Sequence, residues 1–405
     1  MIIDLPSTTT SQVNNKLVEL RQEGGATTLG RVLNLVIVTD DGAKTEDAID
    51  AANDASHEHP CRVIVVARGL KKAAPRLDAQ IRFGGDAGAS EVVVLRLYGA
   101  LADEGASCVM PLLLPDTPVV AWWPFEAPAV PVKDPIGALA HRRITDSAND
   151  RNPLKALDRL KSTYSAGDTD LAWTRLTRWR AYLAAALDLP PHEKVTAASV
   201  TGEADSPSTD LLAAWLSVCL KIPVSRLKAT SGEGIVAVTL ERRTGNVELV
   251  RPDAKVGTLS QPGQPDRRIA LQRKTVRDCL VEELRRLEPD VIYEETLRGL
   301  SKVVRGKAAS TSTTRRASAA KTATSKAATK APASTAKPAG TRTKSAPASA
   351  SAKATTAKAA TNGAAPAAAK AAPRKARSTA ANSANSATAK PESATAEASA
   401  GGSTS

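Results

Sequence analysis

The chain has 405 residues, with 55 Lys and Arg against 42 Asp and Glu and only 11 aromatic side chains. The positive excess lies in the last hundred residues: residues 306–405 hold 16 Lys and Arg against 2 Glu, and no Leu, Ile, Val, Phe, Trp or Tyr. Because such a segment cannot form an apolar core, we predict a disordered tail rich in Ala, Lys, Ser and Thr. The first 305 residues carry 39 basic and 40 acidic side chains, a neutral body large enough for two domains.

The amino terminus shows no targeting signal. Its first ten residues, MIIDLPSTTT, lack a basic region and carry Asp4 within a short apolar patch, unlike a signal peptide. No apolar run approaches the roughly 20 residues that a membrane-spanning helix needs. Cys61 and Cys219 fall in apolar runs typical of buried, reduced thiols. We therefore expect a cytoplasmic protein without membrane contact.

A first domain, with an α/β fold and a mixed sheet, is predicted over residues 1–190. Thr9 and Gln12 form a capping box at the start of a helix over 9–23. Two continuous apolar runs are separated by an Ala-rich helix, which predicts a parallel βαβ unit buried on both faces. The runs are RVLNLVIVTD (31–40) and CRVIVVAR (61–68), and the helix spans about 44–57. A hairpin-like antiparallel pair follows over 78–85 and 91–99.

The rest of this domain is predicted from apolar runs broken by prolines. VMPLLL (109–114) and PVVAWW (118–123) indicate extended chain, and HRRITD (141–146) indicates a short strand. Helices are expected over 153–162 and 170–187.

A second domain, with an α+β fold, is predicted over residues 191–305, after the Pro190-Pro191 pair. A strand over 194–202 and a helix over 208–221 come first. Short alternating segments then indicate a small antiparallel sheet, and an amphipathic helix follows over about 275–287.

Two adjacent tryptophans, Trp122 and Trp123, are unusual in a chain so poor in aromatic residues. Neighbouring side chains on a strand point to opposite faces, so both cannot enter one core. Either both are buried between the sheet and helices on its two faces, or one faces a cleft or a partner. The nearby Arg142, Arg143 and Asp146 could contact an acidic partner or a sugar phosphate, or could pair with each other at the surface. We select these five residues as a candidate partner-binding surface.

No motif selects a reaction. Gly232-Glu-Gly234-Ile-Val-Ala237 lies between two strands, so we interpret it as a hairpin turn and not as a dinucleotide-binding loop. His57-Glu58-His59-Pro60-Cys61 could supply zinc ligands, but histidines at the end of a helix are the favoured interpretation. We predict no metal, no cofactor and no catalytic residues, although an enzyme acting on a sugar phosphate stays open.

Several long segments resemble the actinobacterial OpcA family of glucose-6-phosphate dehydrogenase assembly proteins. They are MIIDLPSTTTSQVNNKLVELR, AANDASHEHPCRVIVVA, FGGDAGASEVVVLRLYG, LPDTPVVAWWP and DPIGALAHRRITD, and the similarity extends to about residue 300. The resemblance implies a non-catalytic protein that binds glucose-6-phosphate dehydrogenase in the oxidative pentose phosphate pathway. It also implies that the protein activates the enzyme allosterically or favours its active oligomer.

The basic tail supports an alternative function. It is not a general feature of the family, and it resembles the Lys/Ala tails of bacterial histone-like proteins. A net charge of +14 spread over a hundred residues is expected to bind nucleic acid with strong salt dependence and little sequence preference. A solubilising spacer is the simpler interpretation of the same composition.

Overall fold

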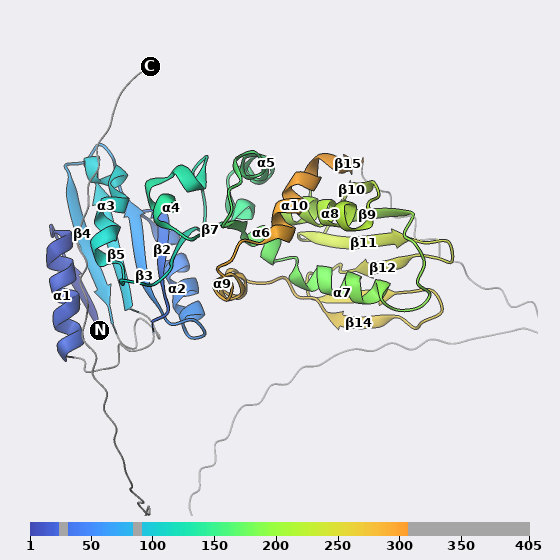
Figure 1. Ribbon diagram of the computed structural model, residues 1–405, viewed down its shortest axis with the longest axis horizontal. Helices are drawn as coiled ribbons and strands as arrows, with labels where there is room; N and C mark the ends of the chain where they lie inside the picture. Colours follow the sequence, from blue (N-terminus) through green and yellow to red (C-terminus); the bar gives the residue numbers. More distant parts are fainter. Residues whose placement is uncertain (24–30, 84–90, 307–405) are drawn as a thin grey trace, which may run out of the picture. The chain divides into compact units, whose positions relative to one another are not determined.

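The computed structural model describes residues 1–23, 31–83 and 91–306. The predicted tail, apart from Gly306, and the loop over 84–90 lie outside the described residues. The described chain has an N-terminal α/β part and a C-terminal part of sheet and helices, as predicted (Figure 1). The boundary between them at residue 190 stays a prediction. In the part of the chain that the structure describes, no helix is long and apolar enough to cross a membrane.

The N-terminal sheet has eight strands in the order β1-β4-β5-β3-β2-β6-β7-β8. From β5 to β8 neighbouring strands pair in parallel, whereas β4 pairs antiparallel with both β1 and β5. The predicted mixed sheet is therefore confirmed. The strands are β1 (Ile2–Leu5), β2 (Leu33–Asp40), β3 (Cys61–Arg68), β4 (Arg76–Arg82), β5 (Glu91–Tyr98), β6 (Val119–Trp123), β7 (Arg142–Thr145) and β8 (Asp168–Asp170).

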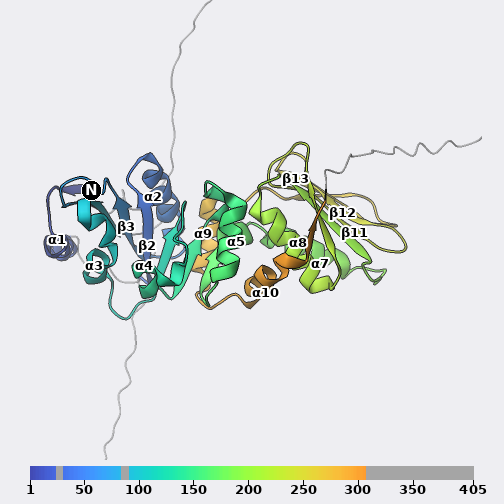
Figure 2. The ribbon, with the colours of Figure 1, turned by 90° about the horizontal axis from the view of Figure 1, so that it is seen from above.

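Helices cover both faces of this sheet, which explains why β2 and β3 are buried along nearly their whole length. One face packs against α1, α3 and α4, and the other packs against α2 and α9 (Figure 2). These helices are α1 (Thr10–Glu23), α2 (Ala43–Ser56), α3 (Gly105–Val109), α4 (Pro135–Leu139) and α9 (Val276–Leu284). The helix α9 comes late in the chain, yet its Leu280 and Leu284 lie in the same core cluster as β2 and β3.

The adjacent tryptophans of β6 enter different cores. Trp123 lies in the core cluster with α1, α3 and α4, and Trp122 lies in the cluster with α2 and α9. Both side chains are buried. Of the two sequence interpretations, the structure shows burial on both faces of the sheet.

Local signals placed α1 correctly. The Gln12 N–H donates to Thr9 Oγ1 at 3.3 Å, and the Thr9 N–H donates to Gln12 Oε1 at 3.0 Å, which is the predicted capping box. The segment over 109–114 was wrongly predicted to be extended. It continues α3 into a 3₁₀ turn over Met110–Leu112, because Pro111 occupies a first-turn position where its missing N–H costs nothing.

The C-terminal sheet has seven strands in the order β14-β13-β12-β11-β9-β10-β15. It is larger than the predicted antiparallel sheet, because β9, α8 and β10 form a parallel βαβ unit, and β15 extends it in parallel. The other pairs are antiparallel. The strands are β9 (Ala197–Gly202), β10 (Val224–Lys228), β11 (Ile235–Glu241), β12 (Val247–Val250), β13 (Val256–Ser260), β14 (Arg267–Ala270) and β15 (Val303–Arg305).

Most strands of this sheet alternate buried and less buried residues, as expected when helices cover a single face. The covering helices share one core cluster with the strands, and they include Trp173 and Trp179 from the segment between the two sheets. The remaining helices are α5 (Pro153–Thr163), α6 (Leu171–Thr174), α7 (Thr177–Leu187), α8 (Pro207–Leu220) and α10 (Val291–Gly299).

The four cysteines all lie in the described part of the chain, where they form no disulfide bonds, and they differ in exposure. Cys61, Cys108 and Cys279 are buried, whereas Cys219 is exposed. The prediction was right for Cys61 and wrong for Cys219, which lies in the last turn of α8 on the side away from the core.

Candidate functional site: a pocket at the amino end of α8

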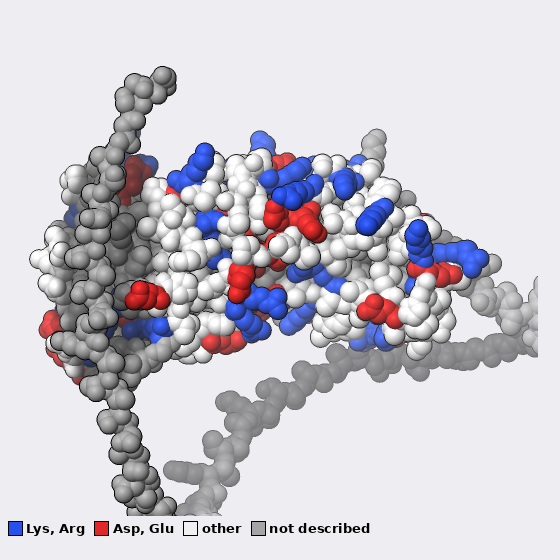
Figure 3. Space-filling view, viewed as in Figure 1, with Lys and Arg blue, Asp and Glu red and all other residues white. Residues whose placement is uncertain are grey.

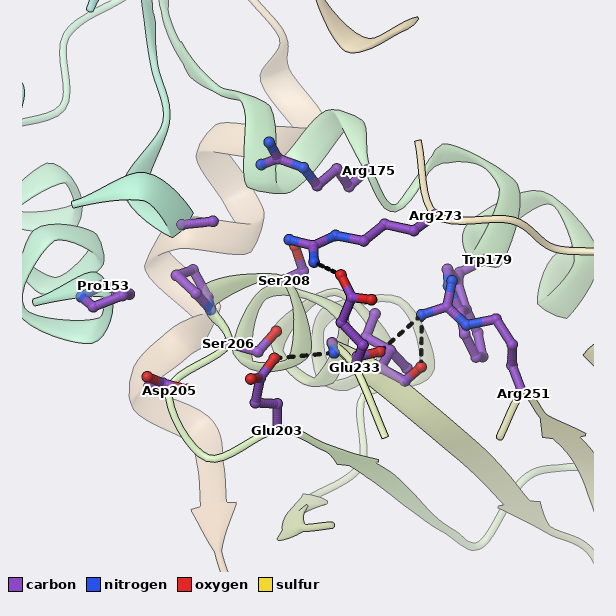
Figure 4. Close-up of a pocket in the computed structure, with 14 residues that line it drawn as sticks. Pro153, Arg175, Trp179, Glu203, Asp205, Ser206, Ser208, Glu233, Arg251 and Arg273 are labelled. Carbon is purple, nitrogen blue, oxygen red and sulfur yellow. Dashed lines mark hydrogen bonds and ion pairs between the residues drawn. The ribbon is translucent and has the colours of Figure 1, made fainter. Parts of the chain in front are cut away.

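A pocket of about 320 Å³ opens where β9 leads into α8 (Figure 4). Its walls come from six segments: the chain around the start of α5, the α6–α7 region, the β9–α8 loop, the β10–β11 loop, the residue after β12 and the chain between β14 and α9. Six of its lining residues are charged: Arg175, Arg251, Arg273, Glu203, Asp205 and Glu233. The lining therefore contains equal numbers of cationic and anionic side chains.

Arg251 is a buried cation that forms no ion pair with any carboxylate among the described residues. Its side chain is held by backbone carbonyl oxygens: Nη1 donates to Leu271 at 3.1 Å, and Nη2 donates to Glu233 at 3.2 Å and to Ile235 at 2.9 Å. The guanidinium also lies over the Trp179 ring, 5.2 Å from its centroid. Burial, and then the charge of Arg273, lower the pKa of Arg251. The protein thus keeps a cation in the wall at an electrostatic cost.

The loop that holds Arg251 is shaped by glycine. Gly234 has φ of +61°, a left-handed conformation that favours glycine, and the Gly234 N–H donates to the carboxylate of Glu203 at 3.1 Å. Next to it, Arg273 forms an ion pair with Glu233. Both contacts show that groups around the pocket already bind carboxylates.

The floor of the pocket is the amino end of α8. Ser206 caps this helix of 14 residues, accepting a hydrogen bond from the Thr209 N–H at 3.3 Å, and Pro207 follows in the first turn. The aligned peptide dipoles of a helix place a partial positive charge at this end. Arg251 and the helix therefore contribute positive potential to the same space.

A second group of buried charges supports one wall of the pocket. Arg175 donates two hydrogen bonds of 2.7 Å to the carboxylate of Asp146. Beside it, Asp170 is fully buried, and burial followed by the charge of Asp146 raises its pKa to about 6. The Thr145 hydroxyl and the Ser147 N–H donate hydrogen bonds to Asp170, which partly offset that rise. This group fixes Arg175 at the pocket edge.

The five residues selected from the sequence are all buried. Trp122 and Trp123 lie in the two cores of the first sheet, and Asp146 binds Arg175. Arg142 donates 2.6 Å hydrogen bonds to Glu283 of α9 and to the carbonyl oxygen of Glu288. Arg143 pairs with Asp168 of the neighbouring strand. The structure does not gather them on one exposed face, and their role in partner binding stays a prediction.

Two of these buried residues still reach surface hollows. Arg142 lines a groove of about 800 Å³ beside the start of α10, where Val291 and Ile292 are exposed. Trp123 lines a hollow of about 610 Å³ at the carboxyl ends of β2 and β6. In open α/β sheets this end of the strands is where ligands bind, because the chain leaves β2 and β6 in opposite directions.

Of the two motifs considered in the sequence, one lines the pocket and the other follows the end of a helix. The Gly232–Gly234 segment is not a hairpin turn, because β9 lies between β10 and β11 and the segment crosses over it. It lines the pocket instead. His57 and Glu58 follow the end of α2, as predicted. Among the described residues, no group of three His, Cys, Asp or Glu side chains could hold a metal ion.

The pocket was missed in the sequence because its residues are spread from Ala148 to Arg273. One signal was available. A predicted strand over 194–202 is followed by Ser206-Pro207 and a helix, which is the order of a βα junction with an N-cap and a first-turn proline. That signal would have located the helix end, but not the arginines.

Two family models match the chain. Residues 52–162 match the N-terminal domain of a glucose-6-phosphate dehydrogenase subunit, and residues 166–297 match the C-terminal domain of the same subunit. The chain belongs to the OpcA family of glucose-6-phosphate dehydrogenase assembly proteins. The pocket takes most of its lining from the C-terminal family domain, with Ala148 and Pro153 from the N-terminal one.

Solved structures resemble the chain only weakly. One is described as glucose-6-phosphate 1-dehydrogenase from Mycobacterium avium; the match has a TM-score of 0.34 and 11% identity, and it covers 68% of this chain and 94% of that one. Another is described as trehalose-6-phosphate from E. coli bound with UDP-2-fluoro glucose; its TM-score is 0.19, with 13% identity over 49% of this chain and 65% of that one. Neither score indicates a shared fold. No curated protein matches the chain.

Proposed function

We propose that this chain is a non-catalytic partner of glucose-6-phosphate dehydrogenase that binds the enzyme and favours its active oligomer. The observation that carries the proposal is the pair of family matches, which follow one another along residues 52–297. The site of action would be the cytoplasm, where this enzyme's pathway operates.

The proposed mechanism is a shift in the equilibrium between oligomers of the dehydrogenase, driven by binding of the chain. A protein that binds the active oligomer more tightly than the inactive form shifts the population toward activity, and the difference in affinity limits the shift. The described surface mixes both signs of charge, as Figure 3 shows on one face, and the folded body is close to neutral. Association is therefore expected to depend on shape and local contacts more than on long-range attraction.

The test is co-purification of the chain with the dehydrogenase, followed by activity measurements at one fixed enzyme concentration. We expect activity to rise and then saturate as the chain is added, together with a larger oligomer in light scattering. A substrate that favours the active oligomer should tighten binding of the chain to the enzyme. The factor should equal that by which the chain tightens binding of the substrate, because coupling is reciprocal. A dehydrogenase whose activity and size ignore the chain would refute the proposal.

A control tests whether the chain has dehydrogenase activity of its own. The isolated chain is incubated with glucose 6-phosphate and either nicotinamide cofactor. We expect no reduction of the cofactor. Turnover by the chain alone would show that it is an enzyme.

We propose that Trp122, Trp123, Arg142, Arg143 and Asp146 contribute to association indirectly. Because these side chains are buried, they would hold the overlying surface in shape. The double variant Arg142→Met/Glu283→Gln tests this, because it removes both charges of one buried pair and keeps an acceptor for Thr174. We expect weaker stimulation of the dehydrogenase. A folded variant that stimulates as well as the wild type would show that the Arg142 assignment is wrong.

The tail supports a second, separable function. We propose that residues 306–405 bind nucleic acid through their net charge of +14. Removing them should abolish DNA binding and leave dehydrogenase activation intact, and DNA affinity of the full chain should fall steeply as salt rises. Equal DNA binding with and without the tail would refute this role.

A further inference from the structure

The pocket at the amino end of α8 contains a buried arginine, Arg251, whose charge is not balanced by a described carboxylate. Arg251 is 4% exposed, and no carboxylate of the described residues forms an ion pair with it. Its Nε is buried, and no group in the described part of the chain forms a hydrogen bond with it. Buried charges in proteins are normally paired, because an uncompensated charge is costly to remove from water. A bound anion would supply the missing partner.

Two further features direct positive potential into the same space. The amino end of α8 closes the pocket, and the positive end of the helix dipole favours an anion there. Arg273 is 39% exposed in its side chain and pairs with Glu233. A guanidinium in such an exposed pair can turn to bind phosphate in forked geometry, since the pair itself contributes little.

The remaining lining argues against a simple inorganic anion. Glu203 and Asp205 are exposed at the pocket, and their charges oppose a second anionic group. Carboxylates are, however, strong acceptors for hydroxyl hydrogen bonds. Ser206 adds a hydroxyl group to the same loop. The lining therefore fits a ligand with one phosphate and several hydroxyl groups.

We propose that this pocket binds a monophosphorylated sugar or polyol. Arg251, Arg273 and the amino end of α8 bind the phosphate, while Glu203 and Asp205 accept hydrogen bonds from the hydroxyl groups (Figure 4). This binding involves no chemical change of the ligand. It is a property of the chain alone and does not depend on association with the dehydrogenase.

The test is calorimetric titration of the full chain with three probes: glucose 6-phosphate, glucose and inorganic phosphate. We expect the sugar phosphate to bind at least tenfold more tightly than either fragment, because only it engages both halves of the lining. Arg273→Gln should weaken glucose 6-phosphate binding about tenfold or more, the loss expected for one charge-assisted contact. Asp205→Asn should weaken the sugar phosphate and leave the affinity for inorganic phosphate unchanged or higher.

The matched control is Arg268→Gln. Arg268 is exposed on β14 and does not line the pocket, so this variant removes one surface charge and keeps the same basic tail. We expect it to bind glucose 6-phosphate as the wild type does. The proposal is overturned if the wild-type chain shows no saturable binding, if Arg268→Gln loses as much affinity as Arg273→Gln, or if inorganic phosphate binds as tightly as the sugar phosphate.

Discussion

Replacing Arg142 with methionine should leave Glu283 as an uncompensated charge in the interior. Arg142 is 3% exposed and Glu283 is 6% exposed, and their charged atoms are 2.6 Å apart. The pair joins β7 of the first sheet to α9, so it fastens a late helix to an early strand. Removing one partner of such a buried pair costs about 3 to 5 kcal/mol.

The assay is thermal unfolding at pH 7, followed by circular dichroism. A loss of about 3 to 5 kcal/mol corresponds to a fall in Tm of roughly 5 to 8 °C if the folded body of about 305 residues unfolds in one step. Arg142→Met/Glu283→Gln should recover most of that loss, because neither side chain then carries a buried charge. The difference between the single and double variants measures the coupling of the two residues.

The matched control lies on the same helix. Arg277 of α9 approaches Asp54 at 3.8 Å, but both side chains are about half exposed. Arg277→Met should therefore change stability by less than about 1 kcal/mol. If Arg142→Met costs no more than Arg277→Met, burial does not control the strength of these pairs and the reasoning is wrong.

Three further predictions concern pH, packing and thiol chemistry. Burial and the charge of Asp146 raise the pKa of Asp170 to about 6, so ionisation of Asp170 opposes folding. Asp170 alone should contribute a loss of up to about 3 kcal/mol of stability as pH rises from about 4 to about 6, and Asp170→Asn should reduce the slope of the urea midpoints over that range. Burial also raises the pKa values of Glu91 and Asp168, so part of the slope should remain. Gly137→Ala places a Cβ atom 1.9 Å from the carbonyl oxygen of Pro131 and should cost about 1 to 3 kcal/mol in the same assay. Gly42→Ala meets no atom within 4 Å and should cost less, about 1 kcal/mol or below, the loss expected when alanine replaces the glycine N-cap of α2. A thiol reagent should label only Cys219 quickly in the native protein and all four cysteines in denaturant; fast labelling of a second thiol would contradict the burial of the others.

Local patterns in the sequence predicted much of the first sheet. The β-branched runs of β2 and β3 and the capping box of α1 each depend on residues close in sequence. The alternation of side chains along β6 also showed that its two tryptophans must point to opposite faces of the sheet. It could not show which elements share the core of Trp122, because one of them is α9, more than 150 residues later. No local pattern states which surface an amphipathic helix will meet.

The candidate site was predictable only in part for the same reason. The amino end of α8 follows from a strand, a cap and a proline in order. The position of Arg251 does not, because its guanidinium is fixed by carbonyl oxygens of β11 and of the chain before α9. Arg142 and Arg143 looked like surface charges in the sequence. Their buried carboxylate partners come from α9 and β8, which only the fold brings near.

The position of α9 in the sequence determines when the core of the first sheet can be completed during synthesis. Residues of β2, β3 and β6 leave the ribosome early together with α2, but the core on that face of the sheet stays incomplete until the helix over 276–284 has emerged. Until then the apolar side chains that pack against α9 are exposed on the nascent chain. A chaperone that shields these side chains, or a pause in translation before residue 276, would therefore alter the yield of soluble protein without changing any contact in the finished molecule.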